Sequence, residues 1–417
     1  MLLDRLPARY RVPLTLYHID GLSHAKVART LGVPESTVRS LVARARHKLT
    51  RGLARAPEVR DMANESRSIR DALDVLDDGA AEAPRLLHVL NGDSVRETLE
   101  HSDVRGAFAP YADILHEGPV PRATGTDAWR ATRARFIAES GYGSYADALR
   151  TYERWDAHLA SFGDYDEVVL WFEHDLFDQL LLIRHLDWFS RGDLGSTTVS
   201  LICIGEFPGY EPFHGLGELG ADQLASLLGT RQRVSGDQIA LGRRAWEAFT
   251  ATDPADLIAL TRDPMPALPF LSGALRRMLE EYPSRATGLP RTERHVLELL
   301  AHGPRSPERL FRDEQRLEER VFMGDWTFWH RVRGLAHGAT PLVRLEVESR
   351  EGPGLPVGMV HITDAGRDVS GGGADWIHLA GFDRWLGGVH LTAPAGGDVA
   401  WRWEPDKARL VREGVDY

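Results

Sequence analysis

Three short stretches of this 417-residue chain are almost continuously apolar, at residues 86–90, 167–172 and 197–204. Each stretch has the length of a β-strand, and helical periodicity occupies the segments between them. Strands that are apolar throughout are buried on both faces, and their alternation with helices is typical of mostly parallel sheets. The sequence therefore predicts an α/β domain over residues 85–285, with a mostly parallel sheet covered by helices on both sides.

Charge is distributed unevenly along the chain. Residues 1–60, here called the basic head, hold 12 lysines and arginines against 4 aspartates and glutamates. Residues 61–417, the acidic body, hold 38 against 57. A basic segment suits a polyanion such as DNA, which an acidic segment would repel. We therefore expect the head and the body to have different partners, with a small molecule or another protein as the partner of the body.

Apolar residues in the basic head recur at helical spacing in three blocks, which Asp20-Gly21 and Gly32 separate. This pattern predicts three helices over residues 11–49, the third beginning at Pro34. One face of the third helix is apolar, and the other is polar and basic. Short polar and arginine side chains near the start of such a helix can reach base edges, and basic residues near its end neutralise phosphates. The predicted DNA-binding residues are Glu35, Ser36, Thr37, Arg39, Ser40, Arg44, Arg46 and Lys48. A small helical bundle with a solvated basic face is the alternative explanation.

A family resemblance supports the DNA-binding interpretation. The segment LPARYRVPLTLYHIDGLSHAKVARTLGVPESTVRSLVARARHKL resembles region four of the sigma-70 family, especially its extracytoplasmic-function branch. The matching features include Leu6-Pro7, Gly21-Leu22-Ser23, Val27-Ala28, Leu31-Gly32 and Thr37-Val38. The resemblance implies a helix-turn-helix over residues 1–55 that binds double-stranded DNA, such as a −35-like promoter element, or RNA polymerase.

The sequence departs from that family in two ways. Lys26 stands where the family usually has a glutamate, so a capping box with Ser23 cannot form. The segment begins at residue 1, so we expect no sigma region two before it; in the family that region binds and helps to melt the −10 element. We therefore expect that this chain does not open promoters alone.

Beyond the basic head, residues 56–84 are expected to form a linker. Residues 286–370 predict three helices followed by a hairpin, which is the element order of a winged helix. Residues 291–370 carry 12 basic and 13 acidic residues, so we expect domain packing or dimer contact there rather than strong DNA binding. Residues 371–417 form a Trp- and Gly-rich extension expected to pack on the body. Its tryptophans are interpreted as core residues, and an aromatic ligand platform with Arg384 and His390 is the alternative.

Polar residues gather where the predicted strands end. Ligands of open α/β sheets bind at the carboxyl ends of strands, so these side chains are expected to converge in one crevice. The candidate catalytic or ligand-binding residues are Asn91, Asp93, Ser94, Asp113, Glu117, Glu173, His174, Asp175 and Asp178. Several carboxylates together could hold Mg²⁺ or Mn²⁺, with Asp93, Asp113 and Asp175 as candidate ligands, or act as general acid and base. The alternative is that Asp93 and Ser94 cap a helix and that the other acids cap or solvate loops.

The body also resembles a known family. HVLNGDS, DILHEGPVP and WFEHDLFDQL are similar to motifs of a bacterial domain of unknown function. That resemblance marks candidate positions and implies no reaction. Its motif residues are Asn91, Gly92, Asp93, Ser94, Asp113, Glu117, Gly118, Pro119, Glu173, His174, Asp175, Asp178 and Gln179.

Composition limits the compartment and the class of site. The single cysteine, Cys203, excludes an intramolecular disulfide and a thiolate zinc cluster, which fits the cytoplasm. The longest apolar runs are too short to span a membrane.

The sequence thus predicts a multidomain α and α/β protein that regulates transcription by binding DNA, with a ligand-sensing or partner-binding body. The alternatives are a metal-dependent hydrolase or nuclease acting on phosphoesters, and an adaptor that binds RNA polymerase. A non-catalytic body is favoured because no spacing matches a diagnostic catalytic motif.

Overall fold

The computed structural model describes residues 84–122, 126–349, 354–412 and 415–416, and only residues 27, 28 and 38 of the first 83. The chain divides into two compact units, residues 1–83 and 84–417. In the first unit, Val27, Ala28 and Val38 are helical and buried, as the periodicity predicts. The predicted DNA-binding residues and most of the predicted linker lie outside the described residues.

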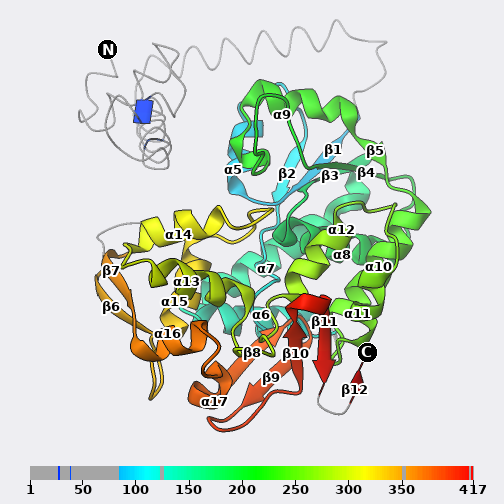
Figure 1. Ribbon diagram of the computed structural model, residues 1–417. Helices are drawn as coiled ribbons and strands as arrows, with labels where there is room; N and C mark the ends of the chain where they lie inside the picture. Colours follow the sequence, from blue (N-terminus) through cyan, green and yellow to red (C-terminus); the bar gives the residue numbers. More distant parts are fainter. Residues whose placement is uncertain are drawn as a thin grey trace, which may run out of the picture. The chain divides into compact units, whose positions relative to one another are not determined.

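A five-stranded sheet forms one end of the second unit (Figure 1). Its order is β2 (Ala107–Pro110), β1 (Leu86–Leu90), β3 (Glu167–Glu173), β4 (Thr198–Ile204) and β5 (Gln232–Arg233). The first four strands are mutually parallel and β5 is antiparallel, so the predicted mostly parallel sheet is confirmed. The three apolar stretches are its three central strands. The edge strands β2 and β5 are short and are not apparent from the apolar pattern.

Both faces of the sheet are buried because side chains alternate between two hydrophobic clusters. Leu87 and Val89 of β1 pack into a large cluster that includes residues of α8 (Leu176–Ser190), α10 (Gly236–Phe249) and α12 (Leu271–Leu279). Leu90 of β1 and Trp171 of β3 face the opposite side, with α5 (Asp93–Leu99) and α9 (Ala221–Leu227). The structure thus confirms the predicted helical cover on both faces.

Three further helices complete the first part of this unit. Helix α6 (Thr126–Glu139) packs against α7 (Tyr145–Ala160), whose N-cap is Ser144, and α11 (Ala255–Arg262) packs against α10. The loop between β2 and α6 carries Asp113 and Glu117. Among the described residues, no helix is long and apolar enough to cross a membrane.

The predicted order of three helices and a hairpin is present after residue 286. It comprises α13 (Arg291–Ala301), α14 (Pro307–Gln315), α15 (Asp325–Gly334), and the antiparallel pair β6 (Val343–Glu348) and β7 (Val357–Ile362). Ser306 is the N-cap of α14 and accepts from the Arg309 backbone N–H, and the N-cap of α15 is Gly324. Helix α15 buries Arg331 together with its apolar residues, so this basic side chain is turned inward.

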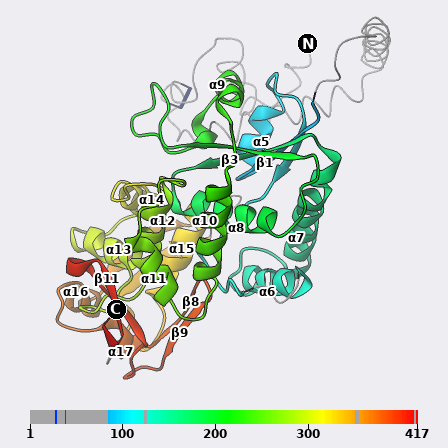
Figure 2. The same ribbon diagram turned by 90° about the vertical axis from the view of Figure 1, so that its right-hand side faces the viewer.

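The C-terminal segment lies at the end of the unit opposite the sheet (Figure 2). It contains α16 (Asp364–Ser370), α17 (Trp376–Ala380), the hairpin of β8 (Phe382–Leu386) and β9 (Val389–Ala393), and the sheet of β10 (Trp401–Glu404), β11 (Arg409–Arg412) and β12 (Val415–Asp416). Trp376, Trp401 and Trp403 are buried, as expected for core residues, and Trp385 is half-buried. Trp376, Trp401 and Trp403 share the large hydrophobic cluster that covers one face of the five-stranded sheet.

Candidate functional site

The ends of β1 and β3 bring polar side chains together because these strands are parallel neighbours. Leu90 pairs with Trp171, so Asn91 follows β1 beside the last residue of β3, Glu173. The Asn91 side-chain amide donates to Glu173 Oε1 at 2.8 Å and to both carboxylate oxygens of Asp178, at 3.1 and 3.0 Å. Asp178 is in the first turn of α8, which Asp175 caps by accepting from the Asp178 backbone N–H at 3.1 Å.

Glu173, Asp175 and Asp178 form a compact group that we call the carboxylate cluster. One oxygen of each residue lies within 4.8 Å of those of the other two, and all three side chains are buried. Backbone N–H groups support the cluster: Leu216 donates to Glu173 Oε1 at 2.6 Å, and Glu173 donates to Asp178 Oδ1 at 2.9 Å. Hard oxygen donors in this number suit Mg²⁺ or Mn²⁺.

The cluster resists full ionisation. Burial, followed by the neighbouring Asp175 carboxylate, raises the pKa of Glu173 to about 8. Burial likewise raises the pKa of Asp175 to about 7, and burial together with Glu173 and Asp175 raises the pKa of Asp178. Three like charges in a dry site cannot all be ionised unless a cation balances them. The cluster can therefore exchange protons near neutral pH or hold a divalent cation.

Asp93 and Ser94 do not belong to the carboxylate cluster. Both are exposed, and the N-cap of α5 is Gly92, which has an extended backbone and no side chain to cap with. Asp93 instead accepts from Arg96 Nε at 3.0 Å, one turn later in the same helix. The alternative prediction that Asp93 and Ser94 cap the helix is therefore wrong, and Asp93 points to solvent rather than to a shared crevice.

Asp113 lies in a different polar site. Its carboxylate accepts from Arg133 Nη2 at 2.6 Å and from the Tyr152 hydroxyl at 2.9 Å, and both charged side chains are fully buried. Arg133 also donates to the backbone carbonyls of Ile114, Glu117 and Pro119, so the pair holds the loop that follows β2. Asp113 follows the edge strand β2, which β1 separates from β3. Asp113 therefore lies outside the carboxylate cluster, and the prediction that it is a metal ligand together with Asp175 is wrong.

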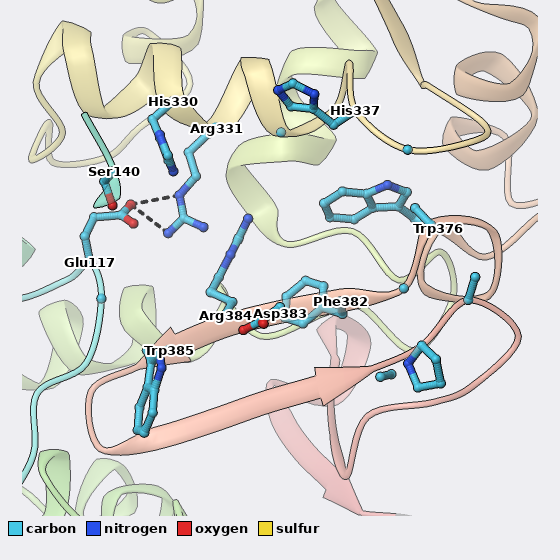
Figure 3. A pocket seen from close by; sticks show the side chains of 18 of the residues that line it. Glu117, Ser140, His330, Arg331, His337, Trp376, Phe382, Asp383, Arg384 and Trp385 are labelled. Carbon is cyan, nitrogen blue, oxygen red and sulfur yellow. Dashed lines mark hydrogen bonds and ion pairs between the residues drawn. The ribbon is translucent and has the colours of Figure 1, made fainter. Parts of the chain in front are cut away.

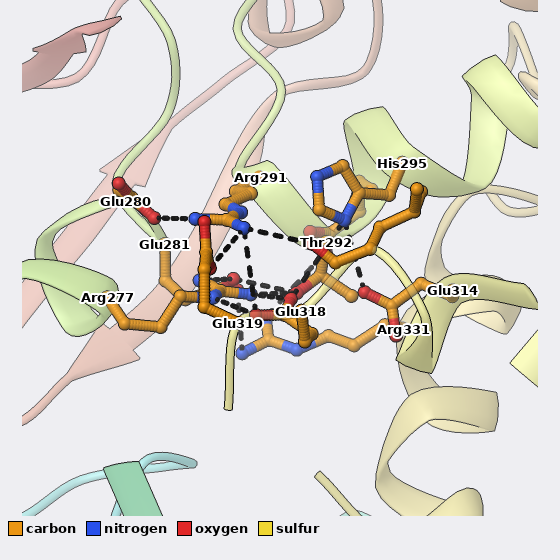
Figure 4. A network of polar contacts seen from close by, with 12 residues as sticks. Arg277, Glu280, Glu281, Arg291, Thr292, His295, Glu314, Glu318, Glu319 and Arg331 are labelled. Carbon is orange, nitrogen blue, oxygen red and sulfur yellow. Dashed lines mark hydrogen bonds and ion pairs between the residues drawn. The ribbon is translucent and has the colours of Figure 1, made fainter. Parts of the chain in front are cut away.

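Glu117 joins a second network through Arg331. Figure 4 shows the part of this network around Arg277, Glu281 and Arg331, which contains mostly glutamate and arginine. Arg331 of α15 donates to Glu117 Oε1 from Nε at 2.8 Å, and its Nη2 lies 2.7 Å from the same oxygen. Arg277 binds both oxygens of Glu318 at 2.8 Å and Glu281 Oε1 at 2.7 Å. Although burial alone would raise the pKa of Glu281, Arg277 and Arg331 hold it well below its usual range. Sequence reasoning missed this network, although Arg277 and Glu281 have the i,i+4 spacing of a helical ion pair.

A second carboxylate group within this network does not form an open metal site. His295, Glu314 and Glu318 lie close enough to share an ion. However, Arg277 already occupies both oxygens of Glu318, and His295 Nδ1 lies 3.3 Å from Glu314 Oε1. These contacts describe a satisfied ion-pair network rather than a vacant ligand set.

His174 and Cys203 lie near the carboxylate cluster but are not poised for chemistry. His174 contacts the rings of Phe213 and Phe270, and burial lowers its pKa to about 4, so it is neutral at pH 7. Cys203 lies in β4, and burial raises the pKa of its thiol to about 12. The thiol therefore stays protonated, as expected of a buried strand residue rather than a nucleophile.

Comparison with known proteins gives a match for the basic head alone. The family model described as Sigma-70, region 4 matches residues 1–49, which confirms the resemblance of the basic head. No curated protein matches the chain. The match indicates a DNA-binding or sigma-factor-like function for the head, and it includes all eight predicted DNA-binding residues.

Proposed function

We propose that this chain is a cytoplasmic transcription regulator that binds double-stranded DNA through residues 1–55 and senses a ligand through its acidic body. The match of residues 1–49 to sigma-70 region four carries the proposal. The excess of basic residues in the head supports it, because DNA affinity depends on neutralising phosphates. RNA polymerase is the second proposed partner of the same segment.

Residues 286–370 are proposed to be a winged-helix-like domain that packs against the body rather than binding DNA. The inward-facing Arg331 on α15 supports this role, because the buried ion pair with Glu117 removes a basic side chain from the surface. The near-neutral charge of this segment points the same way.

Arg39→Ala is expected to weaken binding to a preferred duplex by roughly 5- to 150-fold, since loss of an arginine contact to a base edge costs about 1–3 kcal/mol. The duplex would first be selected from a random library with the full chain, and affinity then measured by fluorescence anisotropy. Arg333→Ala, which removes an exposed arginine from α15, is the matched control and should bind as the wild type does. Equal affinities of the Arg39→Ala variant and the wild type would remove Arg39 from the interface. Capture of RNA polymerase by a chain that binds no duplex would favour the adaptor instead.

The carboxylate cluster favours a second candidate function, a metal-dependent hydrolase of phosphoesters. These three buried carboxylates, to which no lysine or arginine among the described residues is hydrogen-bonded, could hold Mg²⁺ or Mn²⁺ and activate a water molecule. Asn91 would orient Glu173 and Asp178 in that reaction.

If the cluster binds Mn²⁺, the ion should raise the melting temperature of the wild-type chain at pH 8, because a ligand that binds only the folded state stabilises it. Asp178→Asn should abolish the increase, whereas Asp93→Asn, at an exposed position, should leave it intact. Differential scanning calorimetry in Mn²⁺ and in EDTA measures the effect, and hydrolysis of a phosphodiester under the same conditions tests for an enzyme. No Mn²⁺ effect and no hydrolysis in the wild type would exclude this candidate.

A further inference from the structure

A cavity of about 550 Å³ lies away from the carboxylate cluster (Figure 3). Three parts of the chain line it: the loop carrying Glu117 with the end of α6, the second half of α15 with the turn after it, and the segment from α17 to just beyond β9. Its volume falls in the range of pockets that bind small organic molecules. Neither the sigma-like head nor the cluster explains this cavity.

Arg384 supplies the cavity with an unused hydrogen-bond donor. Its Nη2 donates to Glu293 Oε1, but its buried Nη1 has no hydrogen-bond partner among the described residues. The nearest carboxylate oxygen, Glu281 Oε2, is 4.0 Å away. A guanidinium group can only donate, and buried donors are rarely left unpaired. Figure 3 shows the Arg384 side chain extending from β8 towards the pair formed by Glu117 and Arg331. This N–H is therefore available to a ligand, with the unpaired Glu281 Oε2 lying beyond hydrogen-bond distance.

Glu117 supplies an unused acceptor from the opposite wall. Arg331 binds only one of its oxygens, Oε1, and no described residue donates to Oε2. The Glu117 side chain is about 95% buried, since its exposed fraction is 5%. Burial raises the pKa of Glu117 although Arg331 opposes this, so a further donor would stabilise the ionised form. The cavity therefore offers a buried donor, Arg384 Nη1, and an acceptor oxygen on a largely buried side chain, Glu117.

Aromatic and small residues make up most of the rest of the lining. Trp376 and Phe382 are each 7% exposed and contact each other edge to face, with ring centroids 6.0 Å apart. Gly118 has φ +70°, and a Cβ on it would lie 2.4 Å from the Phe136 ring, so glycine is needed where this aromatic ring meets the cavity. At the rim, Asp383 is exposed and can accept hydrogen bonds from sugar hydroxyls.

We propose that this cavity binds a nucleoside or nucleotide by its base. Arg384 Nη1 donates to a ring nitrogen or carbonyl oxygen of the base, and Glu117 Oε2 accepts from a neighbouring N–H. Every nucleobase presents adjacent donors and acceptors on one flat edge, and aromatic side chains bind its faces. The near balance of arginine and glutamate around the cavity favours a base over a phosphate as the group held at its floor. The assignment rests on the proposed function in that it names the ligand class sensed by the body.

Isothermal titration of the full chain with the four ribonucleosides and their 5′-monophosphates tests the proposal. At least one base should show saturable one-site binding, with similar affinity for the nucleoside and its monophosphate. Arg384→Gln should weaken binding roughly 10- to 100-fold, because it removes a charged hydrogen bond. Arg333→Gln, at an exposed position outside the cavity lining, should leave the affinity unchanged.

Glu117→Gln provides a second test in case Arg384→Gln destabilises the fold. The glutamine oxygen can still accept from Arg331, but the free acceptor becomes an N–H₂ donor, so a bound base should lose affinity while the melting temperature shows that the chain is folded. Absence of binding to every base by the folded wild type overturns the proposal, as does binding that inorganic phosphate displaces. Base binding by a chain that fails to bind DNA would contradict the proposed regulator and leave this site standing. DNA binding by a chain that binds no base would overturn the base site and leave the proposed regulator standing.

Discussion

Asp113→Asn is expected to lower the free energy of unfolding of the body by about 3–5 kcal/mol, because it leaves the Arg133 guanidinium buried without a counter-charge. Asp113 and Arg133 are both fully buried, and Arg133 also holds three backbone carbonyls of the loop after β2. All 11 tryptophans lie beyond residue 84, so tryptophan fluorescence during urea unfolding follows the body alone.

Asp127→Asn is the matched control for this substitution. Asp127 pairs with Arg130 on the same helix as Arg133, but its side chain is 95% exposed. Loss of such a surface pair should not change the urea midpoint measurably. Equal midpoints for the Asp113 and Asp127 variants would show that the Asp113 pair does not hold this loop.

The free energy of unfolding of the body should decrease as pH rises from about 5 to 8, and Glu173→Gln is expected to remove much of this decrease. The pKa of Glu173 is raised to about 8 in the folded chain, whereas it titrates near its ordinary value when unfolded. Its contribution is therefore fully present below the unfolded pKa and lost as pH rises through the folded pKa. We expect the wild type to lose about 1–3 kcal/mol more than the variant over this interval.

Urea midpoints at pH 5, 6.5 and 8, measured in EDTA, provide the comparison. Glu97→Gln, at an exposed position of α5, is the control and should follow the wild type. Comparison between variants matters because other buried groups also make stability depend on pH, such as His174, whose pKa burial lowers to about 4 in the folded chain. If the urea midpoints of the wild type and of Glu173→Gln change in parallel with pH, the pKa of Glu173 is not raised in the folded chain.

The sequence predicts the central sheet well but its polar sites only in part. Continuous apolar runs identify β1, β3 and β4, since burial on both faces leaves a local signal. The meeting of Asn91 with Glu173 also follows from the rule that ligands gather at strand ends. The strand order does not follow from the sequence, so the position of β2 at the edge separates Asp113 from residues with which it was grouped.

Partners that are distant in the sequence account for the remaining differences. Arg331 lies 214 residues from Glu117, and no local pattern connects them. The prediction that Asp93 or Ser94 caps α5 is wrong for a backbone reason. The extended Gly92 is the N-cap residue, so Asp93 already lies in the first turn of the helix. Conversely, Arg384 was grouped with the tryptophans as an alternative aromatic platform, and it lines the same cavity as Trp376 and Trp385.

Binding of the full chain to duplex DNA as a function of salt tests the central claim most directly. Neutralisation of phosphates by Arg44, Arg46 and Lys48 predicts that log K falls with log salt with a slope of about −3, and that Arg44→Gln with Arg46→Gln reduces the slope by about 2. Fluorescence anisotropy at salt concentrations from low to physiological measures both slopes. No binding at low salt, or a slope that the paired substitutions leave unchanged, would contradict the assignment of the basic head to DNA.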